Sequence, residues 1–304
     1  MKKIICIGEC SLNIVLDPAG KPLGSIPGGR ITNAAAILAA ADRKVLMASE
    51  VSSDSVGDIL ANYLSGHGVD ITSLDRFTEG RTAVNIFTAP DADSLPVSLT
   101  RYEQYPDECF DIIWPRIDEG DIVLFGGFYA LDSHMRPRLS RFLNNCVERK
   151  ALLIYLPGFL PQQAPRITHV MPAIFENLEI ADVVVATSED LKQIFNTDNP
   201  ANCYRDHIDF YCRSLIAVDT ARHSIDYFSG NNHSSADIPE HRHLTMLWKA
   251  GAIAGIVSAI LENNVTPGEL DAPSTPLRMA IINEAVRSAA KVAENVSGQW
   301  QNIS

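Results

Sequence analysis

The sequence has no hydrophobic run long enough to cross a membrane and no cluster of basic residues. A membrane helix needs about 20 consecutive apolar residues. The 25 Lys and Arg residues are outnumbered by 37 Asp and Glu residues, which gives a formal net charge of −12. Because no stretch concentrates positive charge, we expect neither nucleic acid nor an anionic membrane surface as a partner.

Signals for secretion and for cysteine-based sites are also missing. The amino terminus reads MKKIICIGEC, where the apolar stretch is too short for the hydrophobic region of a signal peptide. The six cysteines form no CxxC pair, which suits a reducing compartment. The histidines between residues 223 and 243 form no i, i+4 pair on a predicted helix. We therefore expect a cytoplasmic protein and assign no metal ligands.

The order of apolar runs and amphipathic stretches predicts an α/β fold. A chain of 304 residues, 46% of them hydrophobic, is long enough to bury a large core. From residue 120 onward strands and helices alternate, which predicts a mostly parallel sheet with helices on both faces. The expected strands are 4–8, 12–16, 44–51, 82–89, 96–102, 120–127, 151–156, 181–186 and 214–219, with a hairpin over 224–238. The expected helices are 31–43, 134–149, 166–178, 188–195, 244–262 and 275–296, together with a helix in the stretch 55–70 that is stopped by Gly66 and Gly68.

A pair of glycines precedes the first helix in the stretch PGGRITN. Gly28 and Gly29 allow the backbone to approach a ligand closely, and the amide of Asn33 can both donate to and accept from neighbouring hydroxyls. Alternatively, the glycines make a turn and Asn33 caps the helix. Spacing alone leaves both interpretations open.

Two stretches resemble the amino-terminal half of the ribokinase-like (PfkB) carbohydrate kinases. They are IGECSLNIVLD and PGGRITNAAAILAAADRKVLMASEVSSDSVGDILANYLSGHGVD. The matching positions are Gly8, Glu9, Gly28, Gly29, Asn33, Ala35, Asp54, Gly57, Gly68, Val69 and Asp70. By element order, the resemblance covers nearly the whole chain.

This resemblance implies a fold, an activity and a set of sugar-binding residues. The fold is a three-layer α/β/α sandwich with a mostly parallel central sheet, formed by residues 1–304 as one domain. Lid strands from about 11–27 and 81–103 imply a homodimer. The activity is phosphoryl transfer from ATP, with Mg, to a sugar hydroxyl. The sugar side comprises Asn13, Gly28, Gly29 and Asn33; the family has Asp at position 13, so Asn13 lacks charge-assisted hydrogen bonding.

The late helix departs from the family pattern. There, Asp-Thr-x-Gly-Ala-Gly-Asp places glycine N–H groups at the transferring phosphate and ends on the catalytic base. Aligning AIAGIV with the family's helix body puts the base on Ala250 and the three small residues on Leu247, Trp248 and Lys249. Loss of a positioned general base costs about 10²- to 10⁴-fold in rate. We expect kinase activity to be absent or very weak.

Other nucleotide-side positions depart in the same way. The family's Asn-x-x-Glu falls on Thr187 and Asp190, and its glycine loop falls on residues 219–224, which begin with Asp219. Asp190 can be read as a cation ligand or as a first-turn carboxylate. Lys249 can be read as a solvated residue or as a weak anion contact. ATP and Mg are therefore implied by the resemblance alone.

Three functions remain open at this point. The first is a sugar-binding pseudokinase with a degenerate phosphoryl-transfer site. The second is an active sugar kinase that uses another carboxylate, such as Asp237 or Glu240. The third is a structural or regulatory dimer that pairs through the strands at about 81–103.

Overall fold

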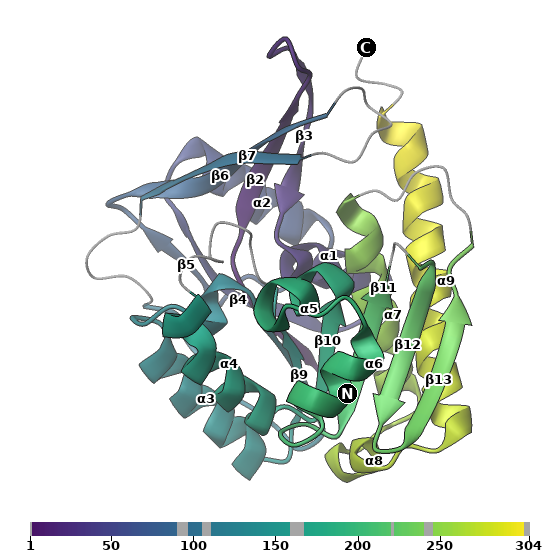
Figure 1. The fold of residues 1–304 in the computed structure, drawn as a ribbon. Coiled ribbons are helices and arrows are strands. Elements are labelled where there is room, and N and C mark those ends of the chain that lie inside the picture. The colour runs from purple at the N-terminus through teal and green to yellow at the C-terminus, as the bar shows by residue number, and fades with distance from the viewer. Residues whose placement is uncertain are drawn as a thin grey trace.

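A nine-stranded sheet forms the centre of the molecule (Figure 1). The computed structural model describes residues 2–89, 97–104, 111–158, 167–219, 222–239 and 246–300. The strand order is β13-β12-β11-β10-β9-β8-β1-β4-β5. Strands β5 to β11 in this order run parallel, and β12 and β13 add an antiparallel hairpin. The bounds are β1 Ile4–Ile7, β4 Val45–Ser52, β5 Leu74–Phe77, β8 Ile122–Gly126, β9 Leu152–Leu156, β10 Val183–Thr187, β11 Ser214–Asp219, β12 Ser224–Ser229 and β13 Asn232–Asp237.

Helices cover both faces of this sheet. Successive side chains of β1 enter different cores: Ile4 and Cys6 pack on one side, and Ile5 and Ile7 on the other. The first face carries α1 (Arg30–Ala40), α2 (Ser55–Gly66), α7 (Met246–Glu262) and α9 (Thr275–Trp300). The second carries α3 (Arg136–Glu148), α4 (Ile167–Ile180), α5 (Ser188–Phe195) and α6 (Pro200–Cys203). The predicted three-layer α/β/α sandwich with a mostly parallel sheet is confirmed.

Small residues bring α7 close to its neighbours. A Cβ atom at Gly255 would lie 2.5 Å from the backbone oxygen of Glu284 in α9, a distance that no side chain can occupy. Helix α7 therefore packs backbone to backbone against α9, and it also contacts α1. These contacts fix where the amino end of α7 lies relative to α1.

A second, four-stranded sheet stands at one end of the molecule (Figure 1). It contains β2 (Ser11–Leu16), β3 (Pro22–Gly28), β6 (Arg81–Thr88) and β7 (Val97–Gln104) in the order β3-β2-β6-β7. The expected antiparallel pairing of β6 with β7 is confirmed. Residues 90–96, within the predicted lid segment, lie outside the described residues. Asp54, the N-cap of α2, accepts hydrogen bonds from the backbone and hydroxyl of Thr82, so this sheet is anchored to α2.

Strand β5 and the short helices α6 and α8 are among the elements that were not predicted from the sequence. Strand β5 reads LDRF, and its two central charges hide the apolar pattern of a strand. Helix α8 (Pro267–Asp271) has only five residues, although its capping box of Thr266 and Glu269 is a recognisable start signal. Across the described ranges, no helix combines the length and the hydropathy of a membrane span.

Candidate functional site

Two of the predicted site residues, Thr187 and Asp219, lie at the carboxyl ends of parallel strands. Glu9 follows β1, Thr187 ends β10 and Asp219 ends β11. In open α/β sheets, the crevice outside the carboxyl ends of the strands is where ligands bind. Residues far apart in the sequence therefore come together at the carboxyl ends of the strands.

The two glycines pack directly against the neighbouring residues of this edge. Gly29 is the N-cap of α1 and has a φ of +97°, which disfavours any side chain. A Cβ at Gly29 would lie 2.5 Å from the backbone oxygen of Glu9, and one at Gly28 would lie 2.4 Å from Asn13 Oδ1. Both positions therefore require glycine, because the chain passes close to Glu9 and Asn13.

Asn33 is held in one orientation by two hydrogen bonds. Its Nδ2 donates to the backbone oxygen of Pro27 at 3.0 Å, and its Oδ1 accepts from the Tyr63 hydroxyl at 3.0 Å. Burial raises the pKa of Tyr63 to about 12, so this hydroxyl stays protonated and remains a donor. The interpretation of Asn33 as a helix cap is wrong, because Gly29 is the N-cap. The amide has a second N–H and a second lone pair for a ligand.

A row of polar side chains crosses the four-stranded sheet beside Gly28. Asn85 of β6 donates to Asn13 Oδ1 of β2 at 2.8 Å. Arg101 of β7 donates to Asn85 Oδ1 at 3.2 Å and to Glu9 Oε2 at 3.0 Å. Sequence reasoning missed Asn85 and Arg101, although a polar residue inside the apolar runs TAVNIFTA and SLTRY was a usable signal. These polar side chains therefore place several oriented hydrogen-bonding groups beside Gly28.

Thr187 and Asp190 form the capping box of α5. Asp190 Oδ2 accepts from the backbone and hydroxyl of Thr187 at 3.0 and 2.7 Å. Arg30, the first residue of α1, forms two bonds to the same carboxylate, at 2.5 and 2.9 Å. Burial of Asp190 favours its protonated form, but Arg30 and Thr187 outweigh this and hold its pKa below the usual range. Its side chain is only 1% exposed, so both carboxylate oxygens face protein groups.

Lys249 pairs with the residue beside Asp190. Its Nζ lies 3.1 Å from Glu189 Oε2, and both side chains are partly exposed. Partial burial raises the pKa of Glu189, but the charge of Lys249 and several hydrogen bonds lower it overall. Lys249, which the sequence suggested as a weak contact for a bound anion, therefore forms an ion pair with the protein's own Glu189.

The position predicted for the catalytic base offers no proton acceptor. Ala250 is 1% exposed, and Trp248, two positions earlier in α7, is buried in the core. Asp219 is also buried, and it accepts from the backbone of Arg222 at 2.9 Å. The next two loop positions, Thr220 and Ala221, lie outside the described residues.

Among the described residues at the carboxyl ends of the strands, the side chains do not fit a magnesium-bound nucleotide. Magnesium is held by carboxylate oxygens together with phosphates and water, whereas Asp190 is engaged by Arg30 and Thr187. Within the described ranges, no group of three or more His, Cys, Asp or Glu is arranged to hold a metal ion. Of the alternative carboxylates, Asp237 is exposed at the end of β13, and Glu240 lies outside the described residues.

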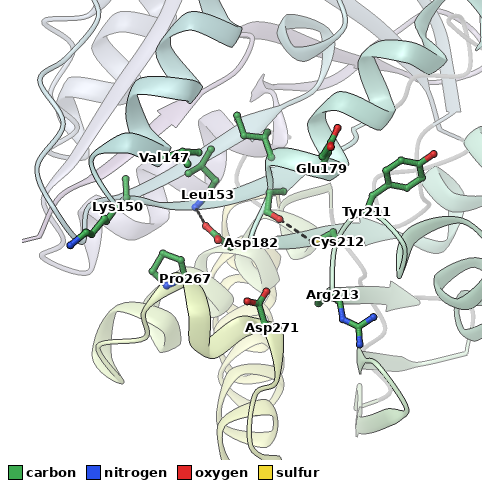
Figure 2. A pocket seen from close by; sticks show the side chains of 13 residues that line it. Val147, Lys150, Leu153, Glu179, Asp182, Tyr211, Cys212, Arg213, Pro267 and Asp271 are labelled. Carbon is green, nitrogen blue, oxygen red and sulfur yellow. Dashed lines mark hydrogen bonds between the residues drawn. The ribbon is translucent and has the colours of Figure 1, made fainter.

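A separate cavity of about 420 Å³ opens at the amino ends of the parallel strands (Figure 2). Its lining includes Leu153, Asp182 and Arg213, which stand at or just before the amino ends of β9, β10 and β11. Burial is the main reason why the pKa of Asp182 is raised to about 6, and Asp271 adds to the effect. This cavity is not part of the predicted site, because it faces the other ends of the same strands.

Comparison with known proteins relates both the sequence and the fold to sugar kinases. A family model described as pfkB family carbohydrate kinase matches residues 1–208. Among curated proteins there is no significant match.

Several solved structures share the fold at low sequence identity. Aminoimidazole riboside kinase from Salmonella enterica, complexed with aminoimidazole riboside and an ATP analogue, has a TM-score of 0.78 at 14% identity, covering 96% of this chain and 93% of that one. Fructokinase from Vibrio cholerae, with fructose, ADP and calcium bound, has a TM-score of 0.74 at 15% identity, covering 95% and 90%. A PfkB protein from a Polaromonas species has a TM-score of 0.69 at 17% identity, covering 96% of each chain.

Proposed function

This chain belongs to the pfkB family of carbohydrate kinases, and we propose that it binds a monosaccharide without transferring phosphate to it. Family membership supports a small sugar as ligand. The oriented amides of Asn13 and Asn33 beside Gly28 and Gly29 suit neighbouring hydroxyls. The protein is then a sugar-binding pseudokinase.

The observation that carries this proposal is the chemistry at the start of α7. The residue aligned with the family's base is Ala250, a buried side chain that cannot accept a hydroxyl proton. The residues aligned with the glycines are bulky, and Lys249 is paired with Glu189. A glycine-lined helix start stabilises a transferring phosphate through free N–H groups, and this helix start lacks those glycines.

Divergence in the last third of the chain also supports the proposal. The family model matches only as far as residue 208, whereas similar structures cover 95% or more of the chain. The fold thus continues through α7, while the sequence pattern of the family is not matched there. This is the pattern expected if packing was retained while the phosphoryl-transfer residues changed.

Isothermal titration tests both halves of the proposal. We expect measurable heat with at least one monosaccharide, and none with ATP and magnesium. The matched control is the same set of titrations with Asn33→Ala, which should lose the sugar heat while remaining folded by circular dichroism. Binding of ATP and magnesium with the affinity of an ordinary kinase would contradict the proposal. The absence of binding heat with every monosaccharide tested would also contradict it.

A dimer is favoured by one further observation. The outer face of the four-stranded sheet carries half-buried apolar side chains in directly paired positions, such as Ile14 opposite Ile86 and Leu12 opposite Val84. Tyr102 of β7 continues this face and is 62% exposed. Large exposed apolar patches mark interaction sites. Our proposal therefore includes a homodimer in which this face meets the same face of a second copy.

The proposal also places the protein in the cytoplasm. Cys6, Cys10, Cys146, Cys203 and Cys212 are buried free thiols. Disulfides are rare where glutathione keeps thiols reduced. Free thiols at all five of these described positions are consistent with such a compartment.

A further inference from the structure

The cavity at the amino ends of the parallel strands is bordered by the carboxyl ends of two helices (Figure 2). Val147 of α3 and Glu179 of α4 line it, and each is the penultimate residue of its helix. The carboxyl end of a helix carries the negative end of its dipole, so both helices favour positive charge at this place. Pockets that hold small molecules have volumes of about 300 to 1,000 Å³, and this cavity, at about 420 Å³, falls within that range.

Two carboxylates line the cavity without a cation from the protein. Asp182 directly precedes β10, and Asp271 is the last residue of α8. Burial is the main cause of the raised pKa of Asp182, and the charge of Asp271 adds to it, so the two carboxylates lie close together. Among the described residues, no Lys, Arg or His forms an ion pair with either carboxylate. Two like charges at a partly buried place are therefore left without compensation.

The basic residues at the rim of the cavity are paired with other acids. Lys150 Nζ lies 3.5 Å from Glu119 Oε1, and Arg213 Nη1 lies 2.7 Å from Asp209 Oδ1. Figure 2 shows the charged ends of Lys150 and Arg213 directed away from Asp182. The protein therefore supplies negative charge and hydrogen-bond acceptors to the cavity and directs these two cations elsewhere.

We propose that this cavity binds a small organic ammonium ion, whose N–H groups donate to the carboxylates of Asp182 and Asp271. Hydrogen bonds in which one partner is ionised are about twice as strong as neutral ones. Val147 and Pro267 supply apolar surface for the carbon chain of such a ligand. A metal ion fits less well, because within the described ranges no group of three or more His, Cys, Asp or Glu is arranged to hold one. The site is separate from the predicted sugar-binding residues, so it does not depend on the proposed function.

Asp182 carries a charge that costs stability in the empty cavity. Its pKa of about 6 means that the folded state disfavours the charged form at neutral pH. The backbone N–H of Leu153 offsets part of this cost by donating to Asp182 Oδ2 at 2.7 Å. A bound ammonium ion would offset more of it, because an opposite charge nearby favours the ionised carboxylate. Carboxylates whose pKa is shifted in this way are common at functional sites.

Calorimetric titration with 1,4-diaminobutane at pH 7.5 tests this inference. We expect saturable binding of one molecule per chain. Asp182→Asn and Asp271→Asn each remove one charged acceptor, and each should weaken binding at least tenfold. The Asn oxygen of the first variant can still accept from the backbone of Leu153, and Asp271 is exposed, so both variants should remain folded.

The dependence of binding on pH identifies the carboxylate that is involved. Asp182 becomes protonated as pH falls through about 6, so affinity for the diamine should fall about tenfold between pH 7.5 and pH 5. Asp182→Asn should remove most of this dependence. Burial raises the pKa of Cys212 to about 12, so this thiol does not titrate in that range. The other charged or titratable side chains that line the cavity are Lys150, Glu179, Tyr211, Arg213 and Asp271.

Three controls separate this site from general attraction of a cation to an acidic protein. Asp198 pairs with Lys192 at 2.8 Å, is mostly exposed and does not line the cavity, so Asp198→Asn should bind the diamine as the unmodified chain does. The uncharged 1,4-butanediol should not bind, and magnesium chloride should bind more weakly than the diamine. The inference fails if the diamine does not bind, if Asp198→Asn loses as much affinity as Asp182→Asn, or if butanediol or magnesium binds as tightly as the diamine. Sugar titrations are independent of these results, so failure of the proposed function is recognised separately.

Discussion

Asn13 and Asn33 carry the same amide in two different settings. Asn33 is fixed from both ends, by Pro27 and Tyr63. Asn13 accepts from Asn85, whose Nδ2 also lies 3.0 Å from Ser11 Oγ. Loss of the Asn13 side chain therefore leaves Asn85 with another acceptor, whereas loss of Asn33 removes a group that no neighbour replaces. Residues of one type thus differ in how far they are preorganised for a ligand.

We predict that Asn33→Ala weakens sugar binding more than Asn13→Ala does. A lost hydrogen bond to a ligand costs about 1 to 3 kcal/mol when its partner stays buried, so the Asn33 variant should lose about 5- to 150-fold in affinity. Tyr63→Phe, which removes the hydroxyl that orients Asn33, should give a smaller loss. Calorimetric dissociation constants measure all three, and equal losses for the two asparagines would show that the sugar lies elsewhere.

Asp182 gives a prediction about stability and pH. Burial raises its pKa in the folded state to about 6, from the ordinary value of about 3.9 for an exposed aspartate. The folded state therefore holds this proton more tightly than the unfolded chain does. The resulting stability is fully present below about pH 4 and is lost as pH rises to about 6.

Asp182→Asn should remove this loss, because the Asn oxygen can still accept from the backbone N–H of Leu153, as Asp182 does at 2.7 Å. We expect the variant to be more stable at pH 7.5, by on the order of 1 to 2 kcal/mol after solvent screening. The difference should shrink at pH 4.5. Urea denaturation at both values measures it, and a stability gain that does not depend on pH would contradict the assignment.

At the scale of elements, the two sheets differ in how far their faces are buried. The nine-stranded sheet is buried on both faces, and the four-stranded sheet has one apolar face that the chain itself only half covers. Asp54 and Thr82 join the smaller sheet to α2, and the pair of Arg101 with Glu9 joins it to the site. A dimer through its outer face would therefore fix the strands that carry Asn85 and Arg101.

We predict that Ile14→Asp converts the protein to a monomer. The substitution places a charge opposite Ile86, at the centre of the paired apolar positions. Ile59→Asp is the matched control, since Ile59 is 49% exposed on α2, outside this sheet. Sedimentation velocity should show a dimer for the unmodified chain and for the control. A monomer for all three proteins would exclude the proposed interface.

The sequence predicted the helices and strands whose hydrophobic periodicity is strong. It did not predict contacts between residues that are far apart in the chain. The parallel strands are continuous apolar runs, and the helices are long amphipathic stretches, so both were predicted. LDRF of β5 has no such pattern. Arg30 and Asp190 are separated by 160 positions, and no local rule joins them. Asp190 was therefore predicted as a cation ligand or a first-turn carboxylate, while its partner Arg30 was not considered.

For the whole molecule, our proposal is that the fold has been kept while the chemistry at the start of α7 has changed. Gly255 still lets α7 pack against α9, because loss of that contact would disrupt the core. The first turn of α7, at the edge of the sheet, is under no such packing constraint at Lys249, which is partly exposed and paired with Glu189. On our proposal, a pfkB-family fold persists here without the residues that move a phosphate.

Sugar-dependent consumption of ATP tests the central claim most directly. The chain would be assayed with magnesium against ketoses, aldoses and nucleosides, beside a heat-inactivated sample and the Vibrio cholerae fructokinase with fructose as a positive control. The account predicts no turnover above the heat-inactivated sample for any of these acceptors. Clear ATP consumption that depends on one of the acceptors, and that is absent after heating, would contradict it.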